Sequence, residues 1–143
     1  MKSKWLLSFA GLSGLVSVAL GAFAAHGLKA KLAPYLLGVF ETGVLYQFIH
    51  TLAVAFCAIL LLLNLGQKAQ KYFFIAAICF IIGIFCFSGS LYALALTGIK
   101  WFGPITPMGG FMFMIGWCLF FLLRLISKRS PSETTNALLP FRL

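Results

Sequence analysis

Long apolar runs alternate with short polar stretches along the chain, and this pattern predicts four membrane-spanning helices. The runs cover about residues 5–25, 43–65, 72–96 and 108–126. Each has the ~20 mostly apolar residues that a helix needs to cross ~30 Å of hydrocarbon. Apart from Arg124 near the end of the last run, none contains Lys, Arg, Asp or Glu. We therefore predict an all-α fold, an integral membrane four-helix bundle.

The segment LAPYLLGVF, residues 32–40, precedes the second run and is too apolar to be a free loop. Its proline, Pro34, suits the first turn of a helix. A straight helix from Pro34 to Leu65 would measure about 48 Å, which exceeds the thickness of the hydrocarbon, so it must tilt, protrude or bend. We expect a bend at Gly38 or Gly43, with a short interfacial helix before the second span.

The composition becomes polar after the fourth run. We therefore predict one four-span transmembrane domain over residues 1–128 and a cytoplasmic tail over residues 129–143. Within the tail, Ser130, Pro131 and Glu133 form a capping-box pattern that would start a short helix. A disordered tail is the alternative.

Composition and charge point to the lipid bilayer as the main partner. The chain is 62% hydrophobic and 9% charged, whereas soluble proteins are about a quarter charged. The net charge of +9 comes from lysines and arginines that stand in ones and twos between apolar runs. The absence of any basic block argues against nucleic-acid binding. Basic residues beside spans are typical of membrane proteins, where they contact anionic headgroups.

The basic residues also predict an orientation. A cytoplasmic amino terminus would place eight of them inside, namely Lys2, Lys4, Lys68, Lys71, Arg124, Lys128, Arg129 and Arg142. The three that would lie outside are Lys29, Lys31 and Lys100. Cytoplasmic loops carry the excess of Lys and Arg, so both termini are predicted to be cytoplasmic.

Small residues recur every four positions in the first and third runs. The candidate helix-packing residues are Ser13, Ser17, Gly21 and Ala25, with Gly89 and Ala93 in the third run. Such stripes let another helix backbone approach closely. Two interpretations stay open, namely packing within the bundle and a homo-oligomer interface.

Polar side chains at membrane depth gather toward the predicted outer side. Tyr46, Gln47 and His50 share one face of the second helix. Glu41, one of only two acidic residues in the chain, precedes them. The full candidate set for ligand or partner binding is His26, Glu41, Tyr46, Gln47, His50, Ser88, Ser90, Tyr92 and Thr106. We predict that these residues form a polar notch that opens outward.

The two titratable residues of the second helix each allow two interpretations. Glu41 is either a carboxylate stabilised by the helix dipole or an ionisable group for proton or cation coupling. His50 belongs either to a structural hydrogen-bond network or to ionisation-linked transport or ligand binding.

Enzymatic motifs are missing from the sequence. It contains no nucleophile elbow, HExxH, Walker loop or EF-hand. The four cysteines show no CxxC spacing, and the set His26, Glu41 and His50 lacks a diagnostic metal-ligand spacing. We therefore predict no catalytic residues, no metal site and no cofactor, and an intramembrane enzyme is the least supported class.

Four motifs carry a resemblance to a known family. They are GAFAAHGL (21–28), FETGVLYQFIH (40–50), FSGSLYALAL (87–96), and ITPMGG followed by GW (105–110 and 116–117). In this order they resemble the YgdD/YwdK-like family of small bacterial membrane proteins, over about residues 11–124. The resemblance implies four transmembrane helices and the bacterial inner membrane. The family has no assigned activity, so the resemblance supplies no catalytic residues.

Two functional hypotheses follow. The first is an accessory or scaffold protein whose polar notch and small-residue stripe bind a membrane partner or a lipid. The alternative is an oligomeric transporter of ions or small molecules that uses Glu41 and His50.

Overall fold

The computed structural model describes residues 2–63 and 65–127, and helices account for almost all of them. The elements in chain order are α1 (Lys2–Phe23), the π-helical turn η1 (Ala24–Leu28), α2 (Pro34–Leu62), α3 (Gln67–Gly83), the π-helical turn η2 (Ile84–Ser88), α4 (Gly89–Thr97), the 3-10 turn η3 (Lys100–Phe102) and α5 (Ile105–Ser127). No strand occurs in these ranges.

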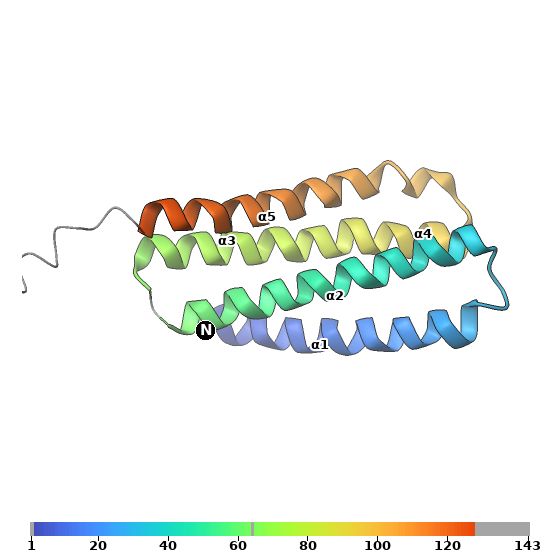
Figure 1. Ribbon diagram of the computed structural model, residues 1–143, viewed down its shortest axis with the longest axis horizontal. Helices are drawn as coiled ribbons and strands as arrows, with labels where there is room; N and C mark the ends of the chain where they lie inside the picture. Colours follow the sequence, from blue (N-terminus) through green and yellow to red (C-terminus); the bar gives the residue numbers. More distant parts are fainter. Residues whose placement is uncertain (1, 64, 128–143) are drawn as a thin grey trace, which may run out of the picture.

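Four continuous helical segments are long and apolar enough to cross a membrane: Lys2–Leu28, Pro34–Leu62, Gln67–Thr97 and Lys100–Leu123. The prediction of an all-α four-span bundle is therefore confirmed. Successive spans run in opposite directions (Figure 1), so the bundle has two distinct ends. We call the end where α1 and α3 begin the proximal end, and the end where α2 and α5 begin the distal end.

The second span, α2, occupies the centre of the arrangement. It packs along α1 on one side and against α3, η2 and α4 on the other. The last span, α5, packs against α3 and η2 (Figure 1). α2 therefore packs along the first and third spans, and it reaches α5 through the side chain of His50.

The short interfacial helix expected before the second span is not a separate element, because α2 is one uninterrupted helix of 29 residues. Neither Gly38 nor Gly43 interrupts it. Gly38 keeps its helical place, and its carbonyl accepts a hydrogen bond from the Thr42 hydroxyl at 2.8 Å. Gly43 instead serves packing, since a Cβ there would lie 2.8 Å from a ring carbon of Tyr92. At about 44 Å, α2 is longer than a perpendicular crossing requires.

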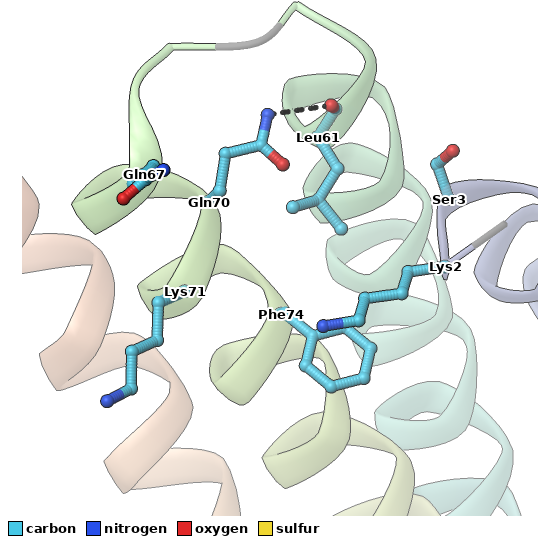
Figure 2. A pocket seen from close by; sticks show the side chains of 7 residues that line it. All are labelled: Lys2, Ser3, Leu61, Gln67, Gln70, Lys71 and Phe74. Atoms are coloured by element: carbon cyan, nitrogen blue, oxygen red, sulfur yellow. Dashed lines mark hydrogen bonds between the residues drawn. The ribbon is translucent and has the colours of Figure 1, made fainter.

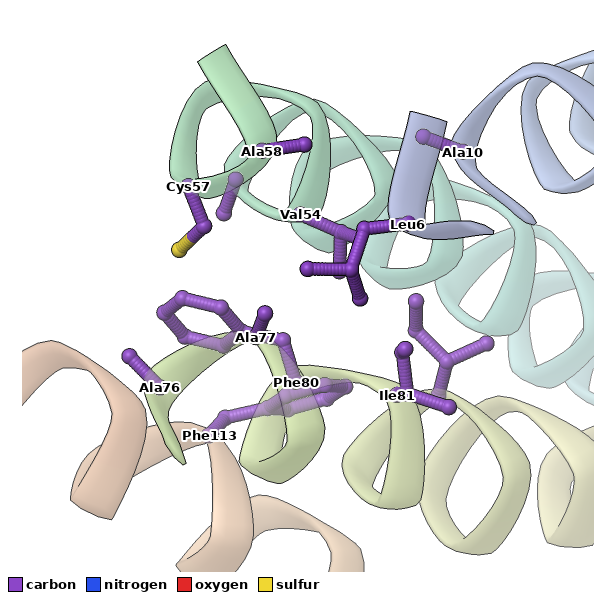
Figure 3. Packing of buried hydrophobic residues seen from close by; sticks show 12 residues of the cluster. Leu6, Ala10, Val54, Cys57, Ala58, Ala76, Ala77, Phe80, Ile81 and Phe113 are labelled. Carbon is purple, nitrogen blue, oxygen red and sulfur yellow. The ribbon is translucent and has the colours of Figure 1, made fainter. Parts of the chain in front are cut away.

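Most of the buried apolar side chains form one cluster, to which α1, α2, α3 and α5 all contribute. Leu6, Val54, Cys57 and Phe80 are completely buried in it, and small alanines fill the space between them (Figure 3). A smaller distal cluster contains Ala24, Leu28, Phe40 and Ala95. The two clusters leave the middle of α2 to polar side chains.

The π-helical turns change which residues face inward. A π-turn holds one more residue than an α-turn and so rotates the helix that follows. In η1 the buried small residue is Ala24, while Ala25 is exposed. In η2 the turn ends at Ser88, which is completely buried.

The fourth span approaches η2 very closely. A Cβ at Gly109 of α5 would collide with the backbone nitrogen of Phe87, and a Cβ at Gly83 or Gly116 would collide with Phe113 or Phe80 respectively. Glycine is therefore required at this contact for steric reasons.

The predicted tail, residues 129–143 with its capping-box residues Ser130, Pro131 and Glu133, lies outside the described residues.

Candidate functional site

A hydrogen-bond network centred on Gln47 joins three helices at the middle of the bundle. The Gln47 amide nitrogen donates to the Ser13 carbonyl at 3.1 Å and to its hydroxyl at 3.3 Å. The Tyr92 hydroxyl donates to the Gln47 amide oxygen at 2.7 Å. The hydroxyls of Ser13 and Thr51 lie 2.6 Å apart. This Gln47 network (Ser13, Gln47, Thr51 and Tyr92) thus ties α2 to α1 and to α4.

His50 lies one turn further along α2 and makes a separate set of contacts. Its Nδ1 lies 2.8 Å from the Tyr46 carbonyl oxygen, which can only accept, so Nδ1 carries the proton. Its Nε2 then accepts the indole N–H of Trp117 at 3.2 Å. The ring stacks on Phe113 with centroids 3.5 Å apart and planes 8° apart. This geometry fits a neutral imidazole in one tautomer, because a proton on Nε2 would break the bond to Trp117.

A third polar contact joins α4 to α5. The Ser90 hydroxyl donates to the Phe87 carbonyl at 2.9 Å. Its single proton is then used, so it accepts from the Thr106 hydroxyl at 2.8 Å. Ser88 is also buried, but its hydroxyl has no hydrogen-bond partner among the described residues.

The two titratable residues at the distal end stand apart from these contacts. Both His26, in η1, and Glu41, near the start of α2, are exposed. Neither makes a hydrogen bond or an ion pair with any residue that the structure describes. Glu41 is also the only acidic residue within the described ranges. Its carboxylate is therefore available to a group outside the described residues.

The nine candidate residues do not share one notch. Gln47 contacts α1 and α4, whereas His50 contacts α5. Tyr46 is 38% exposed and stacks on Phe87 with centroids 4.5 Å apart. The predicted polar floor is thus mostly internal. His26, Glu41 and Tyr46 are exposed, Tyr92 and Thr106 are half-buried, and the other four candidates are buried.

The small-residue stripe of α1 follows α2 for part of its length. Ser13 and Ser17 are buried, and the Ser17 hydroxyl donates to the Ser13 carbonyl at 2.9 Å. Gly21 is half-buried, and a Cβ there would meet Val44 at an ordinary 3.6 Å. Ala25 faces outward. In the third span, Gly89 and Ala93 are half-buried.

The main surface hollow at membrane depth follows the seam of α1 and α2. Its larger part, about 860 Å³, is lined by Leu7, Ala10, Gly11, Gly14, Leu15, Val18, Ala19, Phe48, Thr51, Leu52 and Ala55. A distal part of about 340 Å³ is lined by Ser17, Val18, Gly21, Ala24, Glu41, Val44, Leu45 and Phe48. The two parts share Val18 and Phe48, so we treat them as one α1–α2 groove. The groove ends at Glu41.

A second cavity, of about 320 Å³, lies on the other side of α1, facing η2 and α4. Ser13, Gln47 and Tyr92 form its polar floor. The walls are apolar and include Leu12, Val16 and Phe85. No group of three His, Cys, Asp or Glu side chains within the described ranges could hold a metal ion.

Sequence reasoning missed Thr51, Trp117 and the α1–α2 groove. A Thr inside an apolar run is a common interhelical hydrogen-bonding residue, so Thr51 carried a usable signal. Trp117 belongs to the GW motif but gave no indication of its partner. The groove depends on how two helices cross, which periodicity does not specify.

Comparisons with known proteins gave matches along most of the chain. The family model described as "Protein of unknown function (DUF423)" matches residues 20–110. The UPF0382 inner membrane protein YgdD of Escherichia coli strain K12 is 36% identical over 129 residues, covering 90% of this chain and 95% of the relative. A UPF0382 membrane protein of Haemophilus influenzae is 44% identical over 117 residues, covering 82% and 90%. A UPF0382 membrane protein of Staphylococcus aureus is 37% identical over 119 residues, covering 83% and 93%. No solved structure matches the chain.

Proposed function

Because the chain belongs to the DUF423 family, whose matching relatives are named membrane proteins, we propose that it is a small accessory or scaffold protein of the bacterial inner membrane. Its α1–α2 groove would hold one transmembrane helix of a different membrane protein. The observation that carries this proposal is a groove with a small-residue floor that ends at Glu41, whose carboxylate has no partner among the described residues.

The floor of the groove suits a helix. Gly11, Gly14 and Ala10 come from α1 and line the groove with little or no side chain. Small residues of this kind let two helix backbones pack closely, which supplies van der Waals contact in lipid, where burial gives little driving force. The exposed Leu15 and Leu52 form the opposing apolar walls.

Glu41 supplies charge selectivity at the distal mouth. A carboxylate at the membrane boundary favours a cationic neighbour, so we propose a partner helix with a Lys or Arg at its distal end. An exposed ion pair contributes only about 0–1 kcal/mol. Glu41 would therefore set the direction and choice of the helix more than the strength of binding.

The internal polar contacts favour this function over transport. His50 has both ring nitrogens occupied, by the Tyr46 carbonyl and the Trp117 indole. Glu41 has no polar contact to it. A coupled pathway through these two residues would first have to break the contacts of His50.

We further propose that both termini are cytoplasmic, which places Glu41 on the outer side. The four described lysines of the proximal end would then lie inside, in keeping with the positive-inside rule.

Site-specific photo-crosslinking in native membranes tests the groove. A photoreactive amino acid at Leu15, which is 69% exposed and lines the groove, should crosslink to one other polypeptide. The matched control is Leu12, also on α1 and 64% exposed, which lines the other cavity. Equal crosslinking from both positions, or crosslinking from Leu15 only to lipid or to a second copy, would contradict the proposal.

Matched glycine variants test whether the crosslink depends on the α1–α2 groove. Gly11→Leu should abolish the crosslink, because Gly11 lines the groove and a Cβ there meets nothing within 4 Å. Gly89→Leu is equally unobstructed but lines the other cavity, so it should leave the crosslink intact. Glu41→Lys should weaken the crosslink more than Glu41→Gln, and an acidic replacement of the partner's distal cation should restore it.

A further inference from the structure

We infer that the proximal end of the bundle holds a binding site for the phosphate group of an anionic phospholipid. A cavity of about 500 Å³ lies there between the start of α1, the end of α2 and the start of α3 (Figure 2). Its lining residues are Lys2, Ser3, Leu61, Gln67, Gln70, Lys71 and Phe74. None of them lines the α1–α2 groove, so this site stands independently of the proposed function.

Two cations from different helices border the cavity. Lys2 extends from α1, and its ammonium lies 4.6 Å from the centroid of the Phe74 ring, a cation–π contact that fixes its position. Lys71 comes from α3 and lines the same cavity, and in Figure 2 its side chain extends away from Lys2. The only described carboxylate, Glu41, is at the distal end of the bundle. No acidic side chain in the described ranges therefore neutralises this pair.

Uncharged donors add to the positive potential. The Ser3 hydroxyl makes no hydrogen bond within the described part of the chain. The first turn of α3 has Gly66 as its N-cap and no side-chain cap, so its free backbone N–H groups face the proximal end. The positive ends of the α1 and α3 dipoles both lie at this end of the bundle, which favours an anion there.

The surroundings favour a lipid over a free ion. The cavity sits where three spans end, which is the level of the headgroups, and Leu61 and Phe74 form an apolar wall toward the membrane interior. Basic pockets between the ends of membrane helices are typical sites for anionic headgroups. The hydrogen bond from the Gln70 amide to the Leu61 carbonyl, at 3.0 Å, joins α3 to α2 beside the cavity.

Native mass spectrometry of the full chain in mild detergent tests the site. The protein should retain phosphatidylglycerol in preference to phosphatidylcholine, two lipids that share a phosphodiester but differ in net charge. Lys2→Gln and Lys71→Gln should each weaken phosphatidylglycerol retention roughly fivefold, and the double variant more. The control is the double variant Lys29→Gln and Lys31→Gln, which removes the same charge at the distal end and should leave retention unchanged.

A second arm separates the lipid from a free anion. Inorganic phosphate at millimolar concentration should not displace the bound phosphatidylglycerol. The double variant Lys2→Arg and Lys71→Arg keeps both positive charges and should retain the lipid as the unaltered chain does. Equal retention of the two lipids, equal loss in the distal control, or full displacement by phosphate would each overturn the inference. Circular dichroism of every variant checks that the helices remain.

Discussion

At the scale of single residues, the amide of Gln47 is the most connected polar group in the bundle. It donates to Ser13 and accepts from Tyr92, so both of its ends are satisfied within the membrane. Hydrogen bonds between membrane helices average only about 0.6 kcal/mol. An unpaired buried amide oxygen costs more, about 1–3 kcal/mol. The Gln47 network therefore specifies which faces of α1, α2 and α4 meet.

Removing one donor tests this role. Tyr92→Phe keeps the ring that packs against Phe40 but leaves the Gln47 amide oxygen without its partner. We expect a loss of roughly 0.5–1.5 kcal/mol in stability, measured by thermal unfolding in detergent. Tyr35→Phe is the matched control, since Tyr35 is 74% exposed and should not change the midpoint. Equal midpoints for the two variants would show that the network is not stabilising.

The sequence indicated which polar residues would need hydrogen bonds within the membrane, but it did not indicate their partners. The spacing on the second helix indicated that Gln47 and His50 need hydrogen bonds within the membrane. The actual partners are distant in sequence: Ser13 lies 34 residues from Gln47, and Trp117 lies 67 residues from His50. Such pairs depend on how the spans pack, which local patterns do not encode.

At the scale of elements, the contact between α5 and η2 depends on glycines, which have no side chain. Gly109 brings α5 against the backbone of Phe87, and Gly83 makes room for Phe113. Phe113 then stacks on His50, which connects this contact to the middle of α2. The seam of α5 and the position of His50 therefore depend on the same close approach.

Adding one methyl group at Gly109 tests how closely α5 approaches η2. Gly109→Ala places a Cβ against the Phe87 backbone, which cannot move aside without shifting η2. We expect a loss of about 1–3 kcal/mol or more, with weakened Trp117 contact to His50 seen as a change in Trp fluorescence. Gly110→Ala is the neighbouring control, because its nearest contact would be an ordinary 3.7 Å to the Phe87 ring. Similar stability of both variants would refute the steric argument.

The spans themselves were predictable, but two local details were not. Apolar run length gave the four spans, because crossing the membrane demands it. Length alone did not tell a separate interfacial helix from one long helix, and α2 continues without a break through Gly38 and Gly43. The four-residue spacing did not reveal the wide turn η1, in which Ala24 is buried and Ala25 is exposed.

At the scale of the whole molecule, charge separates the two ends. Lys2, Lys4, Lys68 and Lys71 lie at the proximal end, while Lys29, Lys31 and Lys100 accompany Glu41 at the distal end. The inferred phosphate site and the mouth of the α1–α2 groove thus occupy opposite faces of the membrane. An accessory protein of this form would contact a lipid headgroup on one side and a partner's cation on the other.

Cysteine labelling of intact cells tests the orientation. With the native cysteines replaced by alanine, Ala30→Cys in the distal connection should react with a membrane-impermeant maleimide. Lys68→Cys, in the first turn of α3 at the proximal end, should react only after the membrane is permeabilised. The reverse pattern would place both termini outside and would move Glu41 to the cytoplasmic side.

The wide turn η2 also governs how the chain tolerates insertions and deletions. The turn accommodates one residue more than an α-turn, so losing one residue from Ile84–Ser88 would convert it to ordinary α-helix and leave the helix after it in its present orientation. Tyr92 and Ser90 would then keep their contacts with Gln47 and Thr106. The same loss in the middle of α2, which has no wide turn, would rotate the rest of that helix by about 100°. One-residue losses should therefore be tolerated at η2 and selected against in α2.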